Sequence, residues 1–153
     1  MNHYRIIVAA AALASAAHAS ALESNVSGNA QWVCGGAGEQ ERIELKGMES
    51  KSNAQLLFVT ASRGGYLADV DFVVRDQRGA TVLQGRADGP KCLLTVPAGR
   101  YRVEATYEGT RRSANFQVAG ATGRPGRTVL TFPRDPTDTI ASSPEEKAGV
   151  TVK

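Results

Sequence analysis

Apolar and polar side chains alternate along most of residues 54–132, and this period of two is the strongest constraint on the fold. In the segment LADVDFVVRD, Val70, Phe72 and Val74 fall on one face, whereas Asp69 and Asp71 fall on the other. Clusters of glycine, proline and aspartate interrupt the pattern every 8–12 residues or so, a spacing typical of sandwiches. We therefore predict an all-β, seven-stranded, antiparallel two-sheet sandwich of the immunoglobulin-like kind.

The inward positions of the predicted strands define the expected hydrophobic core. They follow from the alternation alone, because successive side chains of a strand point to opposite faces of its sheet. The expected core residues are Val70, Phe72, Val74, Leu94, Val96, Tyr101, Val103, Ala105, Phe116 and Val118.

The N-terminus has the pattern of an export signal. Arg5 precedes the apolar or small stretch IIVAAAALASAA, and Ala17 and Ala19 occupy the positions that a signal peptidase recognises. The stretch is shorter than the roughly 20 residues that span a bilayer. We therefore predict a signal peptide over residues 1–19 and no membrane span after its cleavage. Cleavage after Ala21 and a buried N-terminal helix are the alternatives.

Three further segments lack the alternation. Residues 20–33 are small and polar, which is typical of a flexible leader. Residues 39–48 are rich in helix formers, with early glutamates and a later lysine, and predict one short helix packed on the sandwich. Residues 133–153 are rich in proline, serine, threonine and charge, and predict a disordered tail. The sandwich domain is therefore expected over residues 34–132.

The mature chain keeps two cysteines, Cys34 and Cys92. In an oxidising compartment such a pair most simply forms one disulfide. Closing a loop of this length stabilises the fold by roughly 4 kcal/mol in the chain-entropy model. Since Cys92 shares a strand face with Leu94 and Val96, we expect it at the edge of the core, beneath the helix. Two separate buried thiols are the alternative.

Both histidines, His3 and His18, lie in the predicted signal peptide, so the mature chain has no imidazole. Ser-His-Asp and Cys-His catalysis and most zinc sites require histidine. We therefore expect a protein that is not an enzyme and that has no catalytic, cofactor or metal site. Asp69 and Asp71 could act as an acid and base without histidine, although outward strand residues are more simply solvated.

The stretch VPAGRYRVEATYEG, residues 96–109, has a structural role at each of its distinctive positions. Pro97 fixes φ and cannot donate to a ladder, so it ends the preceding strand. Gly99 can adopt the positive φ of a tight reversal. Tyr101 is expected to bury its ring while its hydroxyl bonds the backbone, as in the tyrosine corner of immunoglobulin-type domains.

This stretch resembles the signature LPxGxYxVxAxxxG of carboxypeptidase regulatory-like domains, which are transthyretin-like (prealbumin-like) sandwiches. The upstream YLADVDFVVRDQRGATVL resembles a hairpin of the same domains, with Asp76 and Gly79 at its turn. The resemblance covers residues 54–118. The matching signature positions are Val96, Pro97, Ala98, Gly99, Arg100, Tyr101, Arg102, Val103, Glu104, Ala105 and the closing Gly109.

The resemblance implies a prealbumin-like fold and an accessory or binding role rather than a catalytic one. The chain departs from the family in lacking a catalytic domain and in carrying WVCGGAGEQERIEL in front. It is most similar to the small stand-alone exported versions of Gram-negative bacteria, which implies a periplasmic or secreted protein. The hydroxyisourate hydrolases of this fold use histidines and a C-terminal Tyr-Arg-Gly-Ser, and the mature chain has neither.

Charge is nearly balanced overall but unevenly distributed, with a formal net charge of +3 and acidic residues concentrated in the front half. The basic residues could form a face toward an anionic surface, or solvated strand faces that protect sheet edges. Those of the C-terminal half are Arg100, Arg102, Arg111, Arg112, Arg124 and Arg127.

The function that we favour from the sequence is a non-enzymatic exported sandwich that binds an envelope protein or a cell-wall polymer, with no nucleic-acid partner. The alternative is an inhibitor or immunity-type protein that presents a loop to an envelope enzyme; a histidine-free hydrolase is the third. Residues 62–69 are the best candidate loop, with Tyr66, Leu67 and Asp69 as candidate binding residues. Trp32, Tyr66 and Tyr107 are candidate contact aromatics, or are ordinary buried ones.

Mass spectrometry of the exported protein is expected to show Ser20 as its first residue, because signal peptidase recognises the small residues Ala17 and Ala19 and cuts after Ala19. Intact Met1 on cytoplasmic protein would contradict export.

Overall fold

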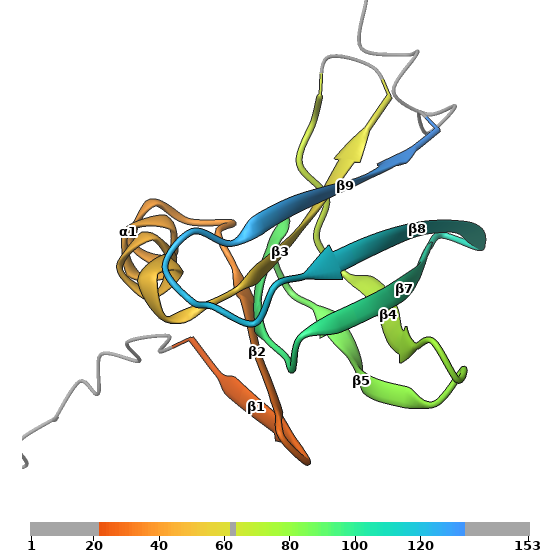
Figure 1. The fold of residues 1–153 in the computed structure, drawn as a ribbon. Coiled ribbons are helices and arrows are strands. Elements are labelled where there is room, and N and C mark those ends of the chain that lie inside the picture. The colour runs from red at the N-terminus through yellow and green to blue at the C-terminus, as the bar shows by residue number, and fades with distance from the viewer. Residues whose placement is uncertain (1–21, 62–63, 134–153) are drawn as a thin grey trace, which may run out of the picture.

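A computed structural model describes residues 22–61 and 64–133, which form two β-sheets and one short α-helix (Figure 1). The predicted signal peptide and the predicted tail beyond Pro133 lie outside the described residues. We call the five-stranded sheet, of order β1-β2-β6-β3-β9, sheet A, and the four-stranded sheet, of order β5-β4-β7-β8, sheet B.

Sheet A consists of β1 (Ser24–Ser27), β2 (Ala30–Gly35), β6 (Lys91–Thr95), β3 (Ala54–Thr60) and β9 (Gly126–Phe132). Sheet B consists of β5 (Thr81–Ala87), β4 (Val70–Asp76), β7 (Gly99–Tyr107) and β8 (Thr110–Val118). The helix α1 (Glu39–Met48) and a 3₁₀ turn (Glu49–Lys51) connect β2 to β3.

The predicted two-sheet, mostly β architecture is confirmed, but the described residues form nine strands rather than seven. The additional strands are β1 and β2, which form a hairpin within and just beyond the segment that we expected to be a flexible leader. We missed β2 because Ala30 and Cys34 are buried on one face while Val33 is buried on the other, which hides the alternation. The sandwich is also not wholly antiparallel, since β3 and β9 pair in parallel.

The predicted helix is confirmed over the expected residues and covers the outer face of sheet A (Figure 1). Leu45 of α1 packs with Val33 of β2 and Leu93 of β6 in a small cluster separate from the main core. The Glu41 carboxylate accepts hydrogen bonds from the backbone N–H groups of Gly36 (2.9 Å) and Ala37 (3.1 Å). These bonds connect the first turn of the helix to the end of β2. Such contacts stabilise α1, because a helix of this length is only marginally stable by itself in water.

The predicted disulfide between Cys34 and Cys92 is confirmed, and its position corrects one expectation. The two cysteines are directly opposite each other on β2 and β6, with their Cα atoms 4.1 Å apart. Both belong to the main core between the sheets. The residue beneath the helix is instead Leu93, since neighbouring residues of a strand point to opposite faces.

The main core lies between the sheets and contains every predicted core residue except Phe116, which packs against it half-buried. Trp32 of β2 contacts Phe72 of β4 edge to face, with ring centroids 5.3 Å apart. The indole reaches sheet B over Gly85 of β5, where a Cβ atom would lie 2.3 Å from a ring carbon of Trp32. The absence of a side chain at Gly85 therefore allows the two sheets to approach.

The tyrosine corner is confirmed at the start of β7. The Tyr101 hydroxyl donates to the Pro97 carbonyl oxygen at 2.5 Å, and its ring is buried and stacks on Phe116 with centroids 5.5 Å apart. Burial of the phenol, reinforced by the nearby Asp76 carboxylate, raises the pKa of Tyr101 above 10.0. The hydrogen bond between Tyr101 and Pro97 joins β7 to the turn that precedes it.

Gly85→Ala is expected to lower the free energy of unfolding by about 1–3 kcal/mol, because the new methyl group would overlap the Trp32 ring. Urea denaturation measures this difference. Gly47→Ala is the control: nothing lies within 4 Å of its added Cβ on α1, and stability should rise by up to about 1 kcal/mol. An unchanged stability in Gly85→Ala would contradict the close contact.

Tyr101→Phe is expected to cost about 1 kcal/mol at neutral pH through loss of the bond to Pro97. Because the folded state raises the pKa of Tyr101, its contribution is complete below the unfolded value near 10 and is lost as the pH rises through the folded value. Denaturation from pH 8 to 11 should therefore show a steeper alkaline loss of stability in the wild type than in Tyr101→Phe. Parallel pH profiles would contradict this assignment.

Candidate functional site

The outer faces of the two sheets differ. Helix α1 covers part of the outer face of sheet A, whereas no other element of the described chain lies over the outer face of sheet B (Figure 1). Strand register places the outward side chains of sheet B in rows across its four strands. The open face therefore presents regular rows of mostly polar side chains to solvent.

One of these rows places two arginines side by side. Arg75 of β4 is directly opposite Arg102 of β7, and the row is completed by Thr81 of β5 and Asn115 of β8. The next outward-facing positions on β7 and β8 are Arg100 and Gln117, which are also opposite each other. Like charges directly opposite one another repel, so the pairing of Arg75 with Arg102 does not itself stabilise the sheet.

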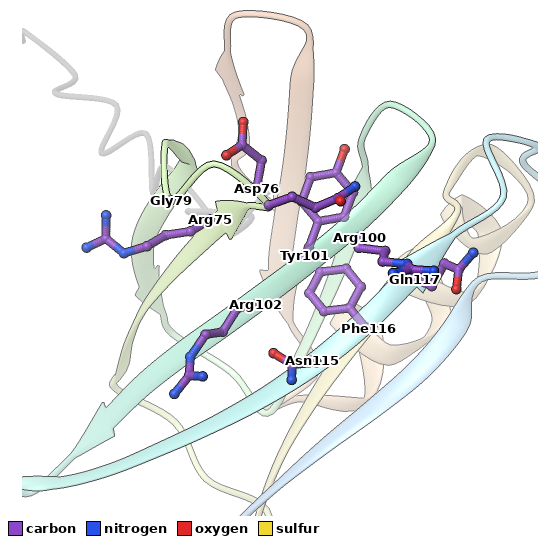
Figure 2. A pocket seen from close by; sticks show the side chains of 10 residues that line it. Arg75, Asp76, Gly79, Arg100, Tyr101, Arg102, Asn115, Phe116 and Gln117 are labelled. Carbon is purple, nitrogen blue, oxygen red and sulfur yellow. The ribbon is translucent and has the colours of Figure 1, made fainter.

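The three arginines and the two amides line a surface groove of about 600 Å³. We call it the arginine groove and define it by Arg75, Arg100, Arg102, Asn115, Phe116 and Gln117. Figure 2 shows the three arginine side chains diverging from neighbouring positions on the two strands. A second hollow, of about 500 Å³, continues along the same face toward Asp71 and Arg111 and shares Arg75 with the groove.

The three arginines differ in how many of their N–H donors already bond to other residues of the chain. Arg75 donates from Nη1 to the Thr81 hydroxyl at 2.8 Å. Arg102 donates from Nη2 to the Ser113 hydroxyl at 3.0 Å and has its Nε 3.5 Å from the Glu104 carboxylate. Within the described chain, Arg100 makes no side-chain hydrogen bond or ion pair. Since a guanidinium carries five N–H donors, most of the donors in the groove remain available to a ligand.

Of the loop that we predicted as a binding element, residues 62 and 63 lie outside the described residues. The described part, from Tyr66 to Asp69, lies beside the β7–β8 turn, at the opposite end of β7 from the β6–β7 turn. Tyr66 is 68% exposed, and its backbone forms a bridge with Val59. The next residue, Leu67, donates its N–H to the Phe58 carbonyl oxygen at 3.1 Å, and its side chain is buried in the core. Of the candidate loop residues, Tyr66 and Asp69 are therefore accessible to a partner and Leu67 is not.

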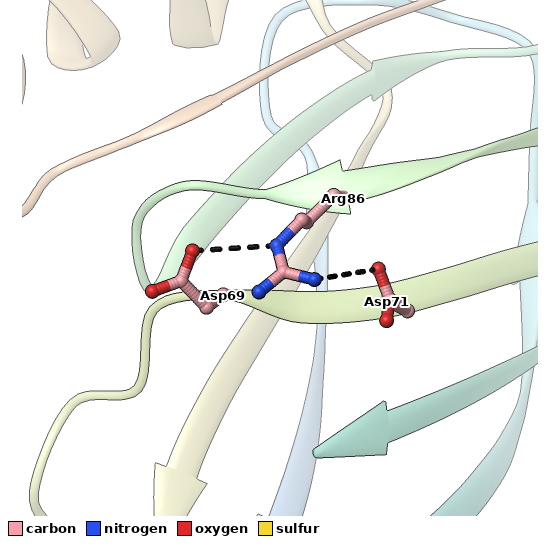
Figure 3. Close-up of polar contacts among 3 residues, drawn as sticks. All are labelled: Asp69, Asp71 and Arg86. Carbon is pink, nitrogen blue, oxygen red and sulfur yellow. Dashed lines mark hydrogen bonds and ion pairs between the residues drawn. The ribbon is translucent and has the colours of Figure 1, made fainter. Parts of the chain in front are cut away.

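Asp69 and Asp71 are brought together by one arginine (Figure 3). The Arg86 Nε lies 3.3 Å from Asp69 Oδ1, and its Nη1 lies 3.5 Å from Asp71 Oδ1. The two carboxylate side chains are 69% and 62% exposed. This arrangement is a solvated surface ion-pair network, not a dry pair of carboxyl groups.

A hollow of about 540 Å³ surrounds this network and includes Tyr66, Tyr107 and Glu108 among its lining residues. Asp69 and Glu108 have φ values of +58° and +46°, and both lie at this end of the molecule. They are the described non-glycine residues with positive φ, a conformation that side chains rarely adopt. Glu108 and Gly109 form the two-residue loop of the β7–β8 hairpin, whose turn type requires positive φ at both residues, whereas Asp69 has no such explanation in the sequence.

The other predicted site residues are distributed over several surfaces. Trp32 and Tyr107 pack against the core and contact Phe72 and Phe132, respectively. Arg111 lies on the open face of sheet B, whereas the Arg112 Nε donates to the Thr131 carbonyl oxygen of β9. The basic residues of the C-terminal half therefore do not share one face. Arg75, which sequence reasoning missed, joins Arg102 only through the pairing of β4 with β7.

Two classes of feature are missing from the described part of the chain. Residues 22–61 and 64–133 contain no cluster of three or more histidine, cysteine or acidic side chains suited to holding a metal ion. Within these same ranges, the structure has no helix with the length and apolar character needed to cross a membrane.

Comparison with known proteins does not assign the chain to a family. Neither a protein-family model nor a curated protein sequence matches it. The carboxypeptidase regulatory-like resemblance therefore stays a prediction, and function has to be argued from the geometry of the surface.

Proposed function

We propose that this protein is a non-enzymatic, exported binding protein of the bacterial envelope, with a prealbumin-like fold, that contacts its ligand through the open face of sheet B. The observation that carries this proposal is the arginine groove. Two like charges held in direct register on an uncovered, hollowed face repel each other, and the Glu104 carboxylate beside Arg102 offsets only part of this charge. Binding of a ligand that compensates this charge would account for the two arginines, which the stability of the fold does not require.

The chemistry of the groove supports binding rather than catalysis. Arginine stays protonated at any physiological pH, and amide side chains such as Asn115 and Gln117 do not titrate. Both kinds of side chain recognise charged and polar groups by hydrogen bonding. The solvated state of Asp69 and Asp71 argues in the same direction, since an acid–base pair is tuned by a drier environment.

Two observations support placing the protein in the envelope. The N-terminal sequence has the features of a cleavable export signal. The Cys34–Cys92 disulfide is compatible with an oxidising compartment such as the periplasm or the exterior of the cell.

Site-specific photocrosslinking in living cells tests the proposal. A photoreactive amino acid would replace Asn115 on the open face of sheet B or, as the control, Gln40 on α1, both of which are exposed. We expect a crosslinked adduct of the exported protein from position 115 and none from position 40, with mass spectrometry reporting what is attached. The absence of an adduct at position 115, or equal adducts at both positions, would refute the proposal.

A second candidate function is favoured by Tyr66. The backbone at Tyr66 is held by the bridge to Val59 and by the neighbouring Leu67 hydrogen bond, while its side chain stays exposed. An anchored backbone with an exposed aromatic ring suits a loop that an inhibitor presents to an envelope enzyme. The same experiment with the photoreactive residue at position 66 distinguishes the two candidates. Adducts at 66 without adducts at 115 would favour the inhibitor.

A further inference from the structure

We propose that the arginine groove binds an extended acidic peptide segment of a partner protein. This inference rests on the proposed function and specifies the ligand of the same face. It follows from the charge of the groove, from the spacing of its donors, and from the amide side chains that lie beside the arginines.

Charge determines the sign of the ligand. Arg75, Arg100 and Arg102 come together at one end of the face, and the carboxylate that contacts one of them, Glu104, lies 3.5 Å from the Nε of Arg102. The Asp76 carboxylate, which also lines the groove, already accepts hydrogen bonds from the backbone N–H groups of Arg78 and Ala80. The unused donors therefore favour an anionic group, and carboxylates match the fork of a guanidinium.

Spacing indicates an extended chain. Arg100 and Arg102 are two residues apart on β7, so their Cα atoms are separated by about 7 Å, which is the i to i+2 repeat of any extended polypeptide. A peptide that lies along β7, with acidic residues at alternate positions, would present one carboxylate to each arginine. The divergence of the arginine side chains in Figure 2 suits separate carboxylates better than one small shared anion.

The neighbouring strand supplies partners for a peptide backbone. Asn115 is opposite Arg102 and Gln117 is opposite Arg100, so amide side chains repeat with the same period beside the arginines. Each amide can both donate to a carbonyl oxygen and accept from an N–H group. The two strands together therefore match the two features of an acidic peptide, namely its carboxylates and its peptide groups.

The distribution of apolar side chains argues against a lipid surface as the ligand. The exposed large hydrophobic residues of the described chain are Val26, Ile43, Tyr66 and Val129, and none of them lines the groove. Peripheral membrane binding combines basic residues with exposed apolar side chains that enter the interface. The aromatic residue in the definition of the groove, Phe116, is half-buried against the core and is not among the exposed large hydrophobic residues.

Fluorescence anisotropy with the disulfide-bonded mature protein tests the inference. The probe is a short labelled peptide in which glutamate alternates with threonine, and the comparison peptide has the same composition with its glutamates contiguous. We expect tighter binding of the alternating peptide and weakening by added salt. Arg100→Gln and Arg102→Gln should each weaken binding roughly tenfold or more, because each removes a charge-assisted hydrogen bond.

Arg111→Gln is the matched control, because Arg111 lies on the same face of sheet B but outside the groove. It should leave the affinity unchanged. Thermal unfolding checks that each variant folds. Arg102→Gln should melt close to the wild-type temperature, because relief of the repulsion from Arg75 offsets loss of the exposed contacts with Ser113 and Glu104.

Several results would overturn the inference: undiminished binding by Arg102→Gln, equal loss in Arg111→Gln, equal binding of both peptides, or binding of inorganic phosphate or phosphatidylglycerol vesicles in place of the peptide. The photocrosslinking experiment separates the two proposals. Adducts at position 115 without peptide binding would refute the acidic peptide and leave the proposed function standing. The absence of both would refute the two proposals together.

Discussion

The pairing of β2 with β6, closed by the Cys34–Cys92 disulfide, is the interaction on which the rest of the architecture depends. On the inner face of this pair, Trp32 reaches across the core to Phe72 and Gly85 of sheet B. On its outer face, Val33 and Leu93 form the surface on which Leu45 of the helix packs. Helix, sheet A and sheet B are thus successive layers, and β2 takes part in both interfaces.

This layering explains why one outer sheet surface is covered and the other is open. A sheet whose two faces are both apolar has to be covered on both sides, and α1 covers the outer face of sheet A at Val33 and Leu93. Sheet B alternates cleanly between buried and exposed residues along β4 and β7, so its outer face needs no cover. The outward side chains that include Arg75 and Arg102 therefore face solvent and are not part of the core.

Several features were predictable from sequence because they depend on local chemistry. The alternation along β4 and β7 identified buried residues such as Phe72 and Val103 correctly, and the charge pattern of residues 39–48 identified the helix. Other features were not predictable, because they depend on contacts between distant segments. The Asn53 side chain, for example, is buried and exchanges hydrogen bonds of 2.7 and 3.0 Å with the backbone of Val96, and neither residue carries a sequence signal for that contact.

The sequence by itself determined the mostly β class, the presence of one helix and the corner at Tyr101, because each depends on residue type and short-range spacing. It determined the disulfide for a different reason, namely that the chain has only two cysteines to pair. Only the tertiary structure decided which strands are neighbours, and with them the composition of the candidate site. Arg75 and Arg102 lie far apart in the chain and become opposite only when β4 pairs with β7 in one register. A shift of one residue would turn one of these side chains toward the core. Strand alternation decides which side chains face outward, but pairing decides which of them meet.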